Sequence, residues 1–91
     1  MDRKTDRQLE GIVRGFANHR RIQILRLLDK TPEMSVEEIT DELDINFRTA
    51  SDHLRRMVVA GLVIKRSEGP CVRHKLTDRA ADVLTFLRKL A

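Results

Sequence analysis

The segment from Ser35 to Arg66 reads SVEEITDELDINFRTASDHLRRMVVAGLVIKR, and it decides which fold we expect. Ser35 followed three residues later by Glu38 is the pattern of a capping box, in which each side chain accepts a hydrogen bond from the other residue's free backbone amide. A helix should therefore begin at Val36. Its core-facing residues recur at helical spacing, and acidic residues occupy the other side. The first set is Val36, Ile39, Thr40 and Leu43, and the acidic set is Glu37, Glu38, Asp41 and Glu42.

A second helix is expected after this one. Asn46 follows a break in the periodicity and is a residue type suited to cap a helix. One arc of about 100° should face the core; it contains Phe47, Ala50, Leu54, Met57 and Val58. The opposite arc contains Arg48, Thr49, Asp52, Arg55, Arg56 and Val59, with Ser51 and His53 on the flanks. Gly61 is placed to end the helix by adopting a positive φ.

A β-hairpin is predicted next. The β-rich runs 62–66 and 72–76 flank the turn-forming residues 67–71. Two helices joined by a tight turn and followed by a hairpin form a winged helix-turn-helix, a mainly α fold with a small β-hairpin wing. In this fold the second helix enters the major groove of DNA. Cationic wing residues would then meet phosphate or the minor groove; these are Lys65, Arg66, Arg73 and His74.

The charge distribution divides the motif into two halves of opposite sign. Residues 29–44 contain one lysine against seven acids, a net charge of −6, whereas residues 45–75 contain seven Lys and Arg residues against two acids, a net charge of +5. The second half would attract a polyanion. Both halves could also be ordinary solvated faces, but the change of sign follows the boundary of the motif, which favours nucleic-acid binding.

The chain resembles the ArsR-type winged-helix repressors. The matching stretches are Asn18 to Leu25, Ser51 to Leu54, Ala60 to Val63 and Lys75 to Thr77. The resemblance covers about Phe16 to the C-terminus and is moderately specific, because MarR-type regulators share the HL…GLV spacing. It implies a homodimer, built from the first and last helices, that represses transcription at an inverted repeat. In the family, the residues matching Ser51 and His53 often touch the DNA backbone; for His53 a structural position between core and surface is an equal alternative.

Many family members respond to metal ions through cysteine pairs in the helix before the turn or through Asp and His clusters in the last helix. Here the acidic helix has no cysteine, and the last helix has Asp78 and Asp82 without a histidine. We therefore predict no metal and no cofactor. Cys71 is the only cysteine. It is either incidental or, beside Arg66 and Arg73, a thiol of lowered pKa that responds to oxidants; with His74 it falls short of a four-ligand metal site unless a second subunit contributes.

Roles on the predicted DNA face follow from position along the helix. Arg48 and Thr49 lie at its N-terminal end, so Arg48 is the best candidate for a bidentate contact to guanine, worth about 1–3 kcal/mol. Arg55 and Arg56 are expected to bind phosphate. Asp52 either accepts from cytosine or, the option we prefer, orients Arg48 and Arg56, so Asp52→Ala should alter sequence preference more than affinity. The predicted DNA contacts are Asn46, Arg48, Thr49, Ser51, Asp52, His53, Arg55, Arg56, Lys65, Arg66, Arg73 and His74.

Apolar stripes near both ends of the chain predict dimerisation helices in residues 1–17 and 78–91, flanking the helix-turn-helix at 35–60 and the wing at 62–76. We expect Asn18 to cap the helix that follows it, and Thr77 or Asp78 to cap the last one. The predicted interface residues are Leu9, Ile12, Val13, Phe16, Val83, Leu84, Phe86, Leu87 and Leu90. The alternative is that these helices pack only on their own domain; a chain of 91 residues buries a modest fraction of its surface, which favours a dimer.

Other classes of function fit less well. Ser51, Asp52 and His53 are adjacent on a helix and point in different directions, so they cannot form a hydrolase triad. The longest apolar run, residues 57–64, is too short to span a bilayer. With no secretory signal expected and a single cysteine, we predict a cytoplasmic protein. The main alternative to DNA binding is a winged-helix module for protein contact, although the arginine-rich face has few exposed aromatic anchors; recognition of double-stranded RNA is disfavoured by its narrow major groove.

Overall fold

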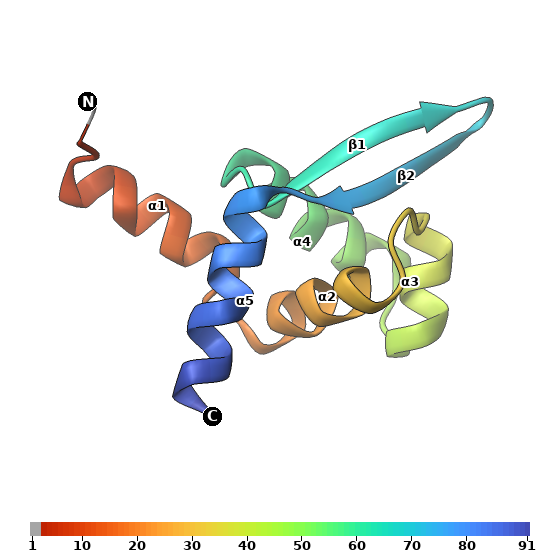
Figure 1. The fold of residues 1–91 in the computed structure, drawn as a ribbon. Coiled ribbons are helices and arrows are strands. Elements are labelled where there is room, and N and C mark those ends of the chain that lie inside the picture. Colours follow the sequence, from red (N-terminus) through yellow and green to blue (C-terminus); the bar gives the residue numbers. More distant parts are fainter. Residues whose placement is uncertain (1–2) are drawn as a thin grey trace.

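The computed structural model describes residues 3–91, in which five helices surround a small core and a hairpin projects from it (Figure 1). The elements in chain order are α1 (Asp6–Phe16), α2 (His19–Lys30), α3 (Val36–Leu43), α4 (Phe47–Val59), β1 (Val63–Glu68), β2 (Cys71–Leu76) and α5 (Asp78–Leu90). This arrangement confirms the predicted winged helix-turn-helix. None of the helices in the described part of the chain is long and apolar enough to cross a membrane.

The helices begin where side chains satisfy their free amides. Ser35 and Glu38 form the predicted capping box, and Asn18 and Asn46 accept hydrogen bonds from the first turns of α2 and α4. At α5 the cap is Thr77 rather than Asp78. A further capping box, which was not predicted, starts α1 and is formed by Thr5 and Gln8. Gly61 has a φ of 75° just after α4, as predicted.

The core is built around α2, which contacts α1, α3, α4, α5 and β2. Its buried face, Ile24, Leu25 and Leu28, packs in one cluster with Leu54 and Met57 of α4. Each of these side chains is at most 1% exposed. Removing a side chain of this size from water contributes about 1.5–3 kcal/mol. The buried stripe of α4 therefore holds that helix in one rotational setting and directs its opposite face outward.

The wing is an antiparallel hairpin whose pairing runs from Val63 with Leu76 to Glu68 with Cys71, so only Gly69 and Pro70 form the turn. The prediction that His74 contacts DNA was wrong, because its side chain is 1% exposed. Its Nδ1 donates to the carbonyl oxygen of Met34 at 2.8 Å, and its backbone amide donates to the same oxygen at 2.9 Å. His74 therefore fastens the wing to the segment between α2 and α3.

The predicted dimer residues divide into two groups. Phe16, Val83 and Leu84 belong to the protein's own core and are between 4% and 9% exposed, so they have little surface left for a partner. On both α1 and α5 the apolar stripe has one side that faces the core and another that faces solvent. The outer side contains Leu9, Val13, Phe86 and Leu90, each at least 47% exposed, with Ile12 and Leu87 half-buried beside them.

Candidate nucleic-acid interface

The turn between α3 and α4 sets the direction of the second helix. Asp44 ends α3 in the left-handed region, with a φ of 53°, and Asn46 then caps α4 by accepting from the backbone amide of Thr49 at 2.8 Å. Since Ala50, Leu54 and Met57 face the core, the opposite side of α4 is open. Its exposed residues are Arg48, Thr49, Arg55, Arg56 and Val59. No part of the described chain covers the two arginines on which the DNA hypothesis depends, Arg48 and Arg56.

Asp52 lies within this exposed face and pairs with cations further along the helix. Its carboxylate accepts from Arg55 and, at 3.1 Å, from Nε of Arg56. The hydrogen bond from Arg55, followed by that from Arg56, lowers the pKa of Asp52. The predicted pairing of Asp52 with Arg56 is therefore present. The predicted pairing with Arg48 is not: the second partner is Arg55, at the i+3 position.

His53 is tied to α2 through Arg21. Nε of Arg21 donates to Nδ1 of His53 at 3.0 Å, and the same guanidinium donates to the carbonyl oxygen of Arg14 at 2.6 Å. Burial, and then the charge of Arg21, lower the pKa of His53. This is the structural position between core and surface that was one of the two alternatives for His53. Its neighbour Ser51 is half-buried.

Of the cationic residues of the wing, Lys65 lies beside α4, whereas Arg66 and Arg73 are paired with carboxylates. Lys65 lies with Arg48, Ser51, Asp52 and Arg55 around a shallow hollow of about 410 Å³. By contrast, Nε of Arg66 donates to Glu33 at 2.9 Å, and Nε of Arg73 donates to Glu68 at 2.9 Å. These carboxylates raise the pKa of both arginines. Arg66 and Arg73 are thus partly neutralised within the protein.

Phe47 is the residue of this surface that the sequence pattern misplaced. The 100° arc put it in the core, yet its side chain is 55% exposed. Phe47 is the first residue of α4, and helical side chains project back toward the N-terminus, where no preceding turn of this helix lies beneath the ring. It is therefore exposed at the end of α4 where base contacts are made in helix-turn-helix proteins.

Residues 3–91 bring no three His, Cys, Asp or Glu side chains together as a metal site. Cys71 is exposed at the start of β2. Asp52 and His53 accept their side-chain hydrogen bonds from arginines, and among the described residues no hydrogen bond links Ser51, Asp52 and His53 to one another. The chemistry available on this surface is that of exposed guanidinium, ammonium, hydroxyl and aromatic groups, which suits binding to a polyanion.

The known proteins that this chain resembles are described as transcriptional regulators or repressors. The family described as "Bacterial regulatory protein, arsR family" matches residues 18–65. An uncharacterized HTH-type transcriptional regulator of Methanocaldococcus jannaschii is 32% identical over 80 residues, which are 87% of this chain and 90% of that protein. A putative arsenical resistance operon repressor of Halobacterium salinarum is 31% identical over 78 residues, 85% of this chain, which spans 60% of that relative's length.

Two solved structures extend the likeness to the fold. The homodimeric winged helix-turn-helix DNA-binding domain of a possible ArsR-family transcriptional regulator from Mycobacterium bovis has a TM-score of 0.82 and 30% identity, covering 99% of this chain and 89% of that one. HlyU from Vibrio cholerae has a TM-score of 0.82 and 29% identity, with 98% and 97% covered. The fold, the exposed basic helix and these relatives agree: the chain belongs to the ArsR family of winged helix-turn-helix transcriptional regulators.

Proposed function

We propose that the protein is a homodimeric repressor that binds an inverted repeat in double-stranded DNA through α4 and the wing. The observation that carries this proposal is the division of α4 into a buried stripe and an exposed basic side. Arg48, Arg55 and Arg56 lie on the exposed side, and the packed stripe fixes where they point. Because this helix is already packed on the core, it can place side chains in the major groove without losing conformational entropy on binding DNA.

The residues have different roles along the helix. Arg48 and Phe47, at its start, contact base edges: the guanidinium donates to guanine, and the ring packs against a thymine methyl group. Thr49 and Asn46 contact the groove or the backbone beside them. Arg55, Arg56 and Lys65 bind phosphates, which supplies affinity without sequence preference. Asp52 pairs with Arg55 and Arg56 and partly neutralises their charge in the free protein.

Two features support a dimer. Leu9 and Val13 of α1 and Phe86 and Leu90 of α5 remain exposed after the core is formed, and large exposed apolar side chains often mark interaction sites. The Mycobacterium bovis relative is described as homodimeric. A two-fold axis through this face relates two α4 helices, and such helices enter successive major grooves about 34–36 Å apart.

Selection of random duplex DNA by the purified protein tests both parts together. We expect an enriched inverted repeat with half-sites about 10 base pairs apart, and sedimentation equilibrium should give twice the chain mass of 10.6 kDa. Enrichment of a single half-site by a monomer would reject the dimer. Absence of any enriched sequence would reject sequence-specific binding.

A further inference from the structure

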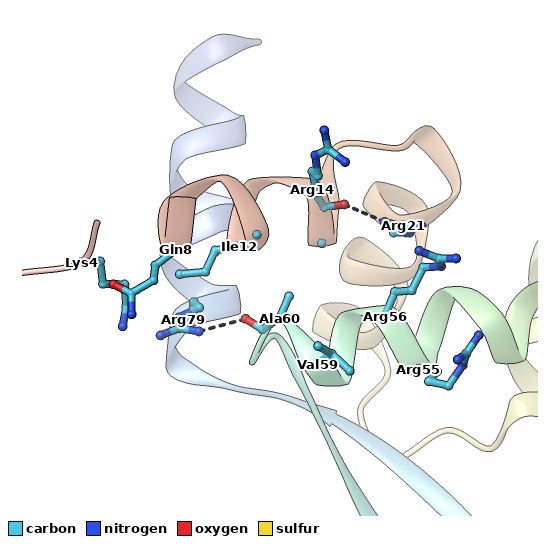
Figure 2. A pocket seen from close by; sticks show the side chains of 12 residues that line it. Lys4, Gln8, Ile12, Arg14, Arg21, Arg55, Arg56, Val59, Ala60 and Arg79 are labelled. Atoms are coloured by element: carbon cyan, nitrogen blue, oxygen red, sulfur yellow. Dashed lines mark hydrogen bonds between the residues drawn. The ribbon is translucent and has the colours of Figure 1, made fainter. Parts of the chain in front are cut away.

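A cleft of about 570 Å³ lies between α1, the C-terminal end of α4 and the start of α5 (Figure 2). Its apolar part is formed by Gly11, Ile12, Val59 and Ala60. At Gly11 a Cβ would meet no atom within 4 Å, so the backbone of α1 borders open space there. Of the α1 residues predicted for the dimer face, the exposed Leu9 and Val13 do not line this cleft, whereas the half-buried Ile12 does. The cleft therefore lies beside the proposed dimer face and shares only Ile12 with its α1 side.

The cleft is strongly positive. Six of its twelve lining residues are Lys or Arg, and none is Asp or Glu. Three of these cations have carboxylate partners nearby, because Arg14 pairs with Glu10, and Asp52 pairs with Arg55 and Arg56. The remaining three, Lys4, Arg21 and Arg79, form no ion pair within residues 3–91.

Arg21 and Arg79 are held by neutral groups instead. Arg79 donates to the carbonyl oxygen of Ala60 at 2.9 Å, and Arg21 donates to the carbonyl oxygen of Arg14 (Figure 2). Arg21 also donates to His53. Burial and then the charge of Arg56 lower the pKa of Arg21, and the charge of Asp52 partly opposes them. Two fixed guanidinium groups, one from α2 and one from α5, thus border an apolar surface.

We propose that this cleft binds a small organic anion with an apolar body. The body would pack on Ile12, Val59 and Ala60, and the anionic group would meet Arg79 and Lys4, which lie near each other with Gln8 at one end of the view in Figure 2. The volume falls in the range of small-molecule sites, about 300–1,000 Å³. Guanidinium groups suit carboxylate, sulfonate or phosphate because they offer paired N–H donors in one plane.

Occupancy of the cleft weakens DNA binding, a step that rests on the proposed function. Arg55 and Arg56 line the cleft and also belong to the face assigned to phosphate. A bound anion places negative charge beside them. Its group also competes with the carbonyl oxygen of Ala60, the C-cap of α4, for Arg79. Because coupling between sites is reciprocal, DNA must weaken anion binding by the same factor.

Fluorescence titration with 8-anilinonaphthalene-1-sulfonate tests the site on the protein alone. Its neutral analogue N-phenyl-1-naphthylamine has the same apolar body without the sulfonate. We expect the sulfonate to bind at least tenfold more tightly than the analogue. Arg79→Gln should weaken sulfonate binding about tenfold, and Gly11→Leu, which fills the cleft from a helical position that favours leucine over glycine, should abolish it. Arg26→Gln, on α2 outside the cleft, is the matched control and should bind as wild type does.

Equal affinity for both compounds would overturn the anion site, as would sulfonate binding by Gly11→Leu at wild-type strength. The second arm repeats the titration with duplex DNA present. A DNA affinity reduced several-fold by the sulfonate in wild type but not in Gly11→Leu supports the coupling, and an unchanged affinity rejects it. Absence of any DNA binding would instead count against the proposed function. It would leave the anion site intact, because sulfonate binding in the first arm is measured without DNA.

Discussion

The carboxylate of Asp52 accepts a hydrogen bond from Nε of Arg56 at 3.1 Å, one turn further along α4. Arg55 is bound by the same carboxylate, so one acid restrains two of the arginines assigned to phosphate. This relationship changes what the substitution of Asp52 should do. From the sequence alone we expected Asp52 to orient Arg48 and Arg56 and its loss to affect mainly sequence preference. Its observed partners are Arg55 and Arg56, the two arginines that we propose bind phosphate.

Asp52→Asn should therefore raise affinity for all duplexes by a similar factor, about two- to fivefold at low salt, because it releases Arg55 and Arg56 and removes repulsion from phosphate. Anisotropy titrations with the selected operator and a scrambled duplex measure this. A changed ratio between the two duplexes, with constant affinity for the scrambled one, would instead place Asp52 on a base edge.

Phe47→Ala should remove a contact to thymine. Packing of the ring against one methyl group is worth about 0.8 kcal/mol, or roughly fourfold in affinity. Replacing the contacted thymine by uracil deletes only that methyl group. Wild type should lose about fourfold on the uracil operator, whereas Phe47→Ala should bind the two operators equally. An equal loss in both proteins would show that the methyl group acts through DNA shape and not through Phe47.

Gly15→Ala should destabilise the fold. A Cβ on Gly15 would overlap the Cβ of Ala60, so α1 must move away from the end of α4. Overpacking of this kind costs about 1–3 kcal/mol. Gly11→Ala is the matched control on the same helix: its Cβ meets nothing, and it should stabilise by about 0.5–1 kcal/mol. Urea unfolding of both variants measures the difference, and equal stability of the two would contradict close packing at Gly15.

The local signals in the sequence were sufficient for most of the fold. Asn18, Ser35 and Asn46 cap the helices they were expected to cap, and Gly61 adopts its positive φ, because these effects depend on neighbours within four residues. The hairpin was also predicted, although its strands extend further into the turn than expected.

Some residues lie elsewhere than the sequence predicted, because their positions depend on long-range contacts or on helix ends, which hydrophobic periodicity does not describe. His74 is buried and forms a hydrogen bond to the carbonyl oxygen of Met34, forty residues away in the chain. Phe47 lies on the core-facing arc, but at the first position of a helix that arc has no core beneath it. An angular position cannot decide whether Asp52 turns toward Arg48 or Arg55, since both lie within reach along the helix. Likewise, Phe16, Val83 and Leu84 share stripes with exposed residues, and only packing separates the two sides.

His74 should make stability depend on pH. Burial is the main cause that lowers its pKa, with a further contribution from Lys65 across the hairpin, while the hydrogen bond to Met34 opposes them. The unfolded chain then takes up a proton that the folded protein does not, so stability present at neutral pH falls as the pH drops below about 6.5. His74→Asn, which keeps a donor for Met34, should show a shallower fall between pH 7 and 5 in urea unfolding. Identical slopes would mean that His74 is protonated without cost in the folded state.

The most direct test of the account is the salt dependence of DNA binding by Arg56→Ala and Arg48→Ala, measured by anisotropy on the selected operator and on a scrambled duplex. We predict that Arg56→Ala weakens binding to both duplexes and reduces the slope of log affinity against log salt by about 1. Arg48→Ala should lose about 1–3 kcal/mol on the operator and much less on the scrambled duplex. Unchanged slopes and an unchanged preference in both variants would contradict the assignment of α4 as the DNA-binding helix.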